Sequence, residues 1–294
     1  MSLSLPALER QLSYFERIGI NAFTDLTDTF TEAPGVYKNM FAVPFSKTEL
    51  KKTGIQIGFL ATSFLFDESF NELSKNKIEP HCNKYVRHIR LPLPILNLRY
   101  NKREKYWFEF GAPNSFHYDW VFLTFSQYGY LAGLITENET LRNLSHDLMQ
   151  ATIYSFVFAQ PLKPLIGRGR PIRDHDDWDD IGPWVWGKSS FNTAGQYTAF
   201  PSFHATFYSS YCTVLMDYLG ARWAGPLLSA FFFFQQPGHV HWLSDIVGAH
   251  IFGYWLASSI LDTPQRSPAK DSLGTKLLIS PQRGGVALNL ILNF

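Results

Sequence analysis

Residues 239–261, HVHWLSDIVGAHIFGYWLASSIL, lead from two histidines, a serine and an aspartate into an almost uninterrupted apolar stretch. A segment of this length without strict alternation of polar and apolar residues favours a buried helix, which we expect over residues 243–261. Similar stretches predict core helices over residues 120–136, 146–162, 203–219 and 223–234. The sequence therefore predicts an all-α protein built as a helical bundle.

The composition supports the same class. Of the 294 residues, 46% are hydrophobic and 16% are aromatic, with 26 phenylalanines. Bulky side chains in this proportion fit thick packed helices better than a thin sandwich, and they exclude disorder for most of the chain. The formal net charge is +1, so the overall balance does not indicate nucleic acid as a partner. Cys82 and Cys212 show no metal or redox spacing, and we expect both to be unpaired.

Most of the apolar stretches fall short of the roughly 20 residues that a membrane-spanning helix needs. We therefore expect the buried helices of a soluble bundle rather than a multi-spanning membrane protein. The first residues, MSLSLPALERQLSYFERIG, lack a cationic segment followed by an apolar core, so no signal peptide is predicted. A periplasmic or secreted location is expected if a signal peptide has been removed.

We expect one domain over residues 1–294. Its predicted parts are an N-terminal strap with an amphipathic helix (1–53), a catalytic helical core (54–261) and a closing β-hairpin (273–294). The amphipathic helix is expected over residues 5–17. The segment that follows, DLTDTFTEAPGVYKN (25–39), is polar and contains Pro34 and Gly35, which predict a broken strap rather than a helix.

Two connecting segments have an unusual charge. Residues 79–119 are rich in Lys, Arg, His and Pro, and they predict an irregular cap whose basic side chains either face water or associate with a membrane surface. Residues 173–190 carry several aspartates and three tryptophans. The aspartates, from Asp174 to Asp180, either bind a divalent cation or keep the loop soluble. Trp178, Trp184 and Trp186 either line a site for a substrate tail or pack the loop against the bundle.

The segment KPLIGRGRP (163–171) places Lys163 and Arg170 on either side of a glycine-containing turn, next to an apolar helix. Two fixed cations can hold the non-bridging oxygens of a phosphate, with Arg170 bidentate and Lys163 as a point charge. A basic cluster at a helix C-terminus also complements the helix dipole on a solvated surface. Taken alone, this segment is weak evidence for a site.

The segment PSFH (201–204) opens another apolar helix. The start of a helix offers free backbone N–H groups, so an anion there gains contacts from Ser202 and from the amide of Phe203. His204 would then protonate a leaving oxygen. The alternative is an ordinary cap at Ser202 followed by a surface histidine.

The third segment, HVHWLSDIVGAH (239–250), has His241 and Asp245 four residues apart, which predicts that they share a helical face. A carboxylate bonded to one imidazole nitrogen fixes the tautomer and leaves the other nitrogen free to attack. His239 has Leu243 at the corresponding position and lacks this partner. A simple capping or salt-bridge pair is the alternative.

Together, the three segments resemble the signature of the type 2 phosphatidic-acid phosphatase and vanadium haloperoxidase superfamily. That signature is Lys, six residues, Arg-Pro; then Pro-Ser-Gly-His; then Ser-Arg, five residues, His, three residues, Asp. The resemblance covers about residues 54–261, and the strap before it and the closing hairpin look like those of the soluble bacterial members. It implies the helical bundle of that family, and a small-molecule or lipid phosphate as substrate.

The resemblance also implies a role for each matching residue. His241 attacks phosphorus to give a phosphohistidine, and Asp245 orients it. His204 protonates the leaving group and then activates water. The phosphate oxygens are held, without a metal ion, by Lys163, Arg170, Ser202 and the Phe203 amide.

Three positions depart from the signature, and the first is Phe203, where the family usually has Gly. Phe234 and Gln235 stand where the family has Ser-Arg, so a neutral amide replaces a cation that normally faces the phosphate. We expect a metal-independent phosphatase acting on a phosphomonoester or diphosphate, with or without a lipid or isoprenoid tail. A haloperoxidase with vanadate bound to His241 is one alternative. An anion- or lipid-binding protein with a weakened site is another. The oligomeric state is not predicted.

Overall fold

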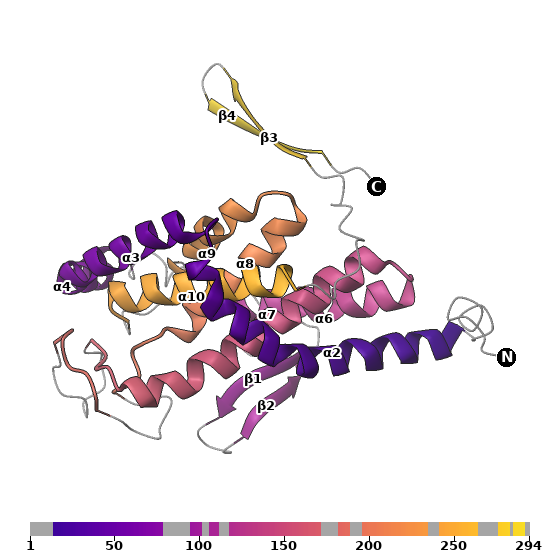
Figure 1. Ribbon diagram of the computed structural model, residues 1–294, viewed down its shortest axis with the longest axis horizontal. Coiled ribbons are helices and arrows are strands. Elements are labelled where there is room, and N and C mark those ends of the chain that lie inside the picture. Colours follow the sequence, from indigo (N-terminus) through magenta and orange to yellow (C-terminus); the bar gives the residue numbers. More distant parts are fainter. Residues whose placement is uncertain are drawn as a thin grey trace.

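The computed structural model describes residues 14–78, 95–101, 106–111, 118–171, 182–188, 196–234, 241–263, 276–282 and 285–291. Within these ranges the protein is mostly helical, with two short antiparallel hairpins (Figure 1). The helical class that the sequence predicts is confirmed. No helix in the described ranges combines the length and the apolar character needed to cross a membrane.

Five helices form the bundle, in the positions that the apolar stretches predict. They are α6 (Tyr118–Ile135), α7 (Glu139–Ile166), α8 (Phe203–Tyr218), α9 (Gly225–Phe234) and α10 (Leu243–Leu261). Helix α8 packs against α7, α9 and α10, and α6 packs against α7. Helix α8 therefore lies at the centre of the bundle, and its first turn carries the PSFH segment.

The core between these helices is aromatic. Tyr154, Phe207 and Tyr211 are almost completely buried, and the ring of Phe122 stacks on Tyr211 with 4.6 Å between centroids. Helices α8 and α10 approach closely at Gly253, where an added Cβ would lie 2.4 Å from the backbone oxygen of Thr206. Only glycine leaves room for this contact, which fixes α10 against α8.

Helix α2 (Tyr14–Ala42) corrects the prediction of a broken strap over residues 25–39, because it continues through Pro34 without interruption. A proline inside a helix costs about 3 kcal/mol. Burial of one face against the bundle offsets that cost: Val36 and Met40 are buried, and the hydroxyl of Tyr37 donates to the carbonyl of Tyr154 at 2.9 Å. Tertiary packing thus overrides the local signal. Residues 5–13 of the predicted amphipathic helix lie outside the described residues.

The remaining elements connect or flank the bundle. They are η1 (Val43–Phe45), α3 (Leu50–Leu65), α4 (Asp67–Leu73), the π-helix η2 (Ser74–Ile78), η3 (Arg222–Ala224), β1 (Ile95–Asn101), β2 (Tyr106–Gly111), β3 (Lys276–Gln282) and β4 (Gly285–Ile291). The prediction of a wholly irregular cap over 79–119 is wrong, since β1 and β2 pair antiparallel there. Strands β3 and β4 pair antiparallel within residues 273–294, apart from the helices in Figure 1.

Candidate active site

The segment KPLIGRGRP begins inside α7 rather than after it. Helix α7 ends at Ile166, four residues beyond the predicted end, so Lys163 lies in its last turn. Gly167 follows in the left-handed conformation with φ of 60°, and its N–H donates to the carbonyl of Lys163 at 2.9 Å. A Cβ at Gly167 would lie 2.5 Å from the backbone of Lys188. Glycine therefore permits the sharp turn that carries the chain into the bundle after α7.

Arg168, to which the sequence analysis gave no role, is completely buried. Its guanidinium donates to Asp245 Oδ1 at 2.5 Å, to Asp67 Oδ2 at 2.6 Å and to the Ser244 hydroxyl at 2.7 Å. The guanidinium carbon also lies 4.5 Å from the centroid of the Trp186 ring. We call Arg168, Asp67, Ser244 and Asp245 the Arg168 cluster.

The Arg168 cluster joins three separate parts of the chain. Asp67 is the first residue of α4, and its carboxylate also accepts from the backbone N–H of Ser244 at 2.8 Å. Asp245 accepts from the backbone N–H of Trp242 at 2.8 Å, which caps the start of α10. Burial raises the pKa of Asp245 to about 6, although the charge of Arg168 opposes that shift. The cluster thus fixes the beginning of α10 against α4 and the segment after α7.

His241 precedes α10, because the helix begins at Leu243 with Trp242 as its N-cap. The predicted placement of His241 and Asp245 on one helical face is therefore wrong. The Nδ1 atom of His241 lies 2.7 Å from the carbonyl oxygen of Ala199, whereas Asp245 Oδ2 is 3.8 Å away. Ala199, and not Asp245, makes the hydrogen bond that orients the ring. The backbone N–H of Ala199 in turn donates to the carbonyl of Arg168 at 3.0 Å.

This contact fixes the tautomer of His241. A carbonyl oxygen can only accept, so Nδ1 carries the proton and the neutral ring has its lone pair on Nε2. Burial, together with the positive charges of Arg170 and Lys163 and with His204, holds the pKa of His241 well below its usual range. The ring is therefore neutral at pH 7. These influences come from residues of all three sequence segments, so Lys163, Arg170 and His204 all lie near His241.

Lys163 is a buried lysine, with 5% of its surface exposed. Burial and the neighbouring charge of Arg170 hold the pKa of Lys163 well below its usual range, and Asp245 opposes that shift. An anion that enters beside Lys163 would favour its protonated form and would be held by it.

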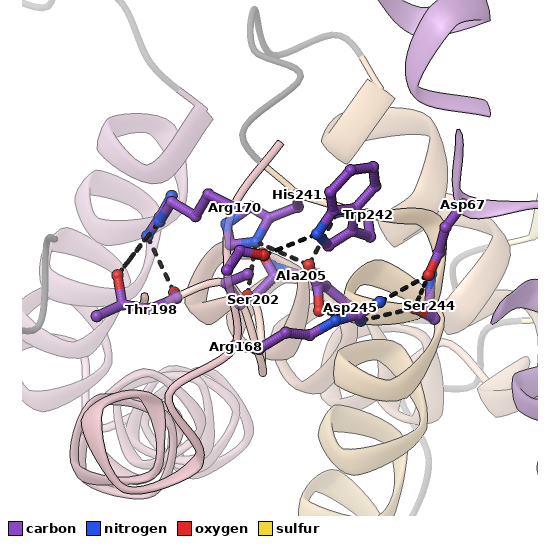
Figure 2. A network of polar contacts seen from close by, with 12 residues as sticks. Asp67, Arg168, Arg170, Thr198, Ser202, Ala205, His241, Trp242, Ser244 and Asp245 are labelled. Carbon is purple, nitrogen blue, oxygen red and sulfur yellow. Dashed lines mark hydrogen bonds and ion pairs between the residues drawn. The ribbon is translucent and has the colours of Figure 1, made fainter. Parts of the chain in front are cut away.

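Arg170 is buried and is oriented by Thr198. Its Nε and Nη2 atoms donate to the Thr198 hydroxyl at 3.2 and 3.1 Å, and Nη2 also donates to the Thr198 carbonyl at 3.1 Å. Figure 2 shows the polar contacts of the site as one network, with Arg170 and Thr198 at one end, His241 in the middle, and Asp67 with Ser244 at the other end. We call Lys163, Arg170, His204 and His241 the His241 cluster.

The PSFH segment forms the predicted N-cap. Ser202 is completely buried, and its hydroxyl accepts from the backbone N–H of Ala205 at 3.4 Å. Phe203 is the first residue of α8, so its amide belongs to the start of the helix. The side chain of His204 is 45% exposed, with Nε2 3.9 Å from Asp119 Oδ2. His204 is thus the one member of the His241 cluster that is open to solvent.

Other predictions have mixed outcomes. Gln235, His239, Cys82, Trp178 and the aspartates from 174 to 180 lie outside the described residues. Cys212 is a free, buried cysteine, as predicted. Trp184 and Trp186 both pack against Phe64, with ring centroids 5.8 and 6.1 Å apart. No group of three or more potential metal ligands occurs within the ranges that the structure describes.

Comparison of the chain with models of protein families, with curated proteins and with solved structures finds no match.

Sequence reasoning missed four residues that shape this site: Asp67, Thr198, Asp119 and Arg168. Asp67 and Asp119 are distant from the motifs, and Thr198 lies three residues before PSFH, but no local pattern marks any of them. Arg168 could have been noticed, since it stands between two glycines inside the first motif. Its two carboxylate partners lie 101 and 77 residues away along the chain, so the sequence alone did not pair them.

Proposed function

We propose that this protein is a phosphatase with a helical bundle of the type 2 phosphatidic-acid phosphatase kind. It transfers the phosphoryl group of a phosphomonoester or diphosphate first to His241 and then to water, without a metal ion. The observation that carries this proposal is the geometry of His241: its ring is buried, and Nδ1 donates to the Ala199 carbonyl, which leaves the lone pair on Nε2. Lys163 and Arg170 both act to lower its pKa.

Phosphoryl transfer requires positioning and stabilisation of negative charge more than covalent chemistry. Lys163 supplies a point charge and Arg170 a planar donor set for the non-bridging oxygens. The Ser202 hydroxyl and the Phe203 amide lie at the start of α8, where the helix dipole favours an anion. Each group has a place in the reaction that the three motifs imply.

In the first step, Nε2 of His241 forms a bond to phosphorus and the bond to the leaving oxygen breaks, while His204 gives that oxygen a proton. In the second step, water attacks phosphorus, His204 accepts the proton from water, and the phosphorus–nitrogen bond breaks. The phosphohistidine carries a positive ring in between. Asp245, 3.8 Å from Nδ1, stabilises that charge through space rather than through a hydrogen bond.

The aromatic side chains beside the Arg168 cluster favour a substrate with an apolar tail. Trp184 is 63% exposed and stacks on Phe64, whose ring faces the Arg168 guanidinium at 5.0 Å. Leu165, in the last turn of α7, is 71% exposed. A lipid or isoprenoid chain would bury these side chains when its phosphate occupies the His241 cluster.

The test is hydrolysis of 4-nitrophenyl phosphate in the presence of a chelator, with and without orthovanadate. Alkaline quenching during turnover, followed by mass spectrometry of peptides, would locate a phosphohistidine. We expect turnover that vanadate inhibits, and a phosphoryl group on the peptide that contains His241. Halide oxidation by hydrogen peroxide after addition of vanadate, without hydrolysis, would instead identify a haloperoxidase. Absence of both activities would contradict an enzymatic role.

A further inference from the structure

Asp119 lies in the first turn of α6, outside the three motifs, and its carboxylate faces two residues of α8. The hydroxyl of Tyr208 donates to Asp119 Oδ1 at 2.9 Å, and Asp119 Oδ2 lies 3.9 Å from Nε2 of His204. His204 and Tyr208 are four residues apart, so they share one face of the helix. The carboxylate therefore connects the exposed histidine of the site with a buried tyrosine.

The position of His204 disfavours a protonated ring. It is the second residue of α8, where the positive end of the helix dipole opposes a cation. His204 also contributes to the lowered pKa of His241. The positive charges of Lys163, at the end of α7, and of Arg170, in the segment after it, lower the same pKa. A histidine that protonates a leaving group must hold a proton at the working pH. A negative charge is needed to oppose these influences.

Asp119 is placed to supply that charge. Its Oδ2 atom lies within ion-pair distance of the His204 ring, 3.9 Å from Nε2. Asp245 lies near His241 but is held by Arg168. Burial raises the pKa of Tyr208 well above its usual range, so the tyrosine stays protonated and donates to Asp119. One carboxylate oxygen is thus fixed by Tyr208, and the other faces His204.

We propose that Asp119 is the positioning residue for His204: it faces Nε2, keeps the imidazole protonated, and directs the Nδ1 proton to the leaving oxygen. This inference rests on the proposed function. As the phosphorus–oxygen bond breaks, the proton moves from Nδ1 to the leaving oxygen, and Asp119 remains ionised throughout. When water attacks the phosphohistidine, Nδ1 takes a proton back and the pair returns to its starting state.

The substitution Asp119→Asn tests this role, because the amide keeps the shape and an acceptor for Tyr208 but loses the charge. Asp147→Asn is the matched control. Asp147 accepts from the hydroxyl of Tyr218 at 2.8 Å near the other end of α8, so it reproduces the tyrosine contact without His204. Two substrates separate the effects: a primary alkyl phosphate, whose leaving oxygen needs a proton, and 4-nitrophenyl phosphate, whose leaving group departs without one.

We expect Asp119→Asn to lower kcat/KM for the alkyl phosphate by about 10²-fold, and for 4-nitrophenyl phosphate by less than about threefold. The alkaline limb of the alkyl phosphate profile should move to lower pH. Asp147→Asn should leave the ratio of the two substrates unchanged. In a His204→Gln background, Asp119→Asn should cause no further loss. Equal losses with both substrates would show that Asp119 is only structural, and would overturn the inference.

A second measurement does not depend on turnover. Histidine ring signals are followed by NMR against pH, with the His204 signal identified by its loss in His204→Gln. We expect Asp119→Asn to move the His204 midpoint to lower pH by at least about one unit. An unchanged midpoint overturns the inference even if the enzyme is active. If the wild type hydrolyses neither substrate, the proposed function fails, and the midpoint still decides whether Asp119 controls the protonation of His204.

Discussion

The Arg168 cluster and the His241 cluster take their arginines from positions only two residues apart, yet the two arginines have different contacts. Arg168 is completely buried and donates to two carboxylates, Asp67 and Asp245. Arg170 donates to the neutral Thr198, and its charge depresses the pKa of both Lys163 and His241. Arg168 is paired with two carboxylates, and Arg170 adds positive charge near a histidine.

This difference separates stabilisation from ligand binding within one segment. Removing one partner from a buried ion pair leaves an uncompensated charge, so substitutions in the Arg168 cluster should destabilise the fold. Positive charges gathered around a neutral histidine are unfavourable without an anion, and they become favourable when one is bound. The comparison predicts that changes in the first cluster affect mainly the free energy of unfolding, and changes in the second mainly affect turnover.

The largest expected effect follows from removal of the nucleophile. We expect His241→Ala to lower kcat for 4-nitrophenyl phosphate by at least about 10³-fold while the far-ultraviolet circular dichroism is retained. His239→Ala, two residues earlier, should keep most of the activity. A reversed ranking of the two variants in a single-turnover assay would contradict the assignment of His241.

Arg168→Met removes the shared cation of two buried carboxylates. We expect it to lower the free energy of unfolding by about 3–5 kcal/mol, measured by urea denaturation. The matched variant Arg170→Met, in the same segment, should lower that free energy by clearly less. Equal losses of stability in the two variants would remove the distinction between the clusters.

Arg170→Met should instead act on turnover. Loss of a charged donor to the developing negative charge is expected to lower kcat/KM by about 10²–10³-fold. Adding guanidinium or an alkylguanidine to the variant should restore part of the activity, because a planar cation fits the space left by the side chain. Wild-type kinetics in a folded Arg170→Met protein would exclude Arg170 from the site.

A smaller effect concerns pH. The folded-state pKa of His241 is depressed, so the unfolded chain binds more protons than the folded one below about pH 6.5, and His241 then lowers stability as pH falls. Asp245, with a pKa raised to about 6, works in the opposite direction between about pH 4 and 6. Comparing a variant with the wild type isolates the contribution of His241. When the pH is lowered from 7.5 to 5, the free energy of unfolding of His241→Gln should rise by about 2 kcal/mol relative to that of the wild type. No relative gain in urea denaturation would mean that His241 is not held neutral.

The smallest effect is expected at Gln235, which stands at the position of the motif arginine. A neutral amide forms a weaker bond to a phosphate oxygen than a guanidinium does. We expect Gln235→Arg to raise turnover of 4-nitrophenyl phosphate at least about tenfold, equivalent to roughly 1.4 kcal/mol. Unchanged turnover in a folded variant would show that the site is adapted to the amide and to a different substrate.

The sequence predicted well what depends on neighbouring residues. Long apolar stretches gave the core helices, and the ends of α8 and α10 were correct within one residue. The cap at Ser202 was also predicted, because its hydroxyl needs only the first turn of its own helix. These features follow from local hydrogen bonding and from the periodicity of apolar side chains.

Errors arose where distant contacts decide the outcome. Helix α2 continues through Pro34 because Val36 and Met40, after the proline, are buried against the bundle. A prediction from the local proline and glycine could not include the free energy of that packing. His241 was assigned to Asp245 from a spacing of four residues, but the helix starts two residues later and the histidine bonds to Ala199. Arg168 was overlooked because both its carboxylates come from distant elements. Pairing of buried charges is a property of the fold, and a single sequence does not display it.

The central claim, that the His241 cluster is built for an oxyanion, is tested most directly by calorimetric titration with orthovanadate. We compare the wild type with Lys163→Met and with the control Lys38→Met, which removes an exposed lysine of α2. One vanadate should bind per chain, the Lys163 variant should bind at least about tenfold more weakly, and the Lys38 variant should match the wild type. Binding of equal strength in all three proteins, or no binding in the wild type, would contradict the claim.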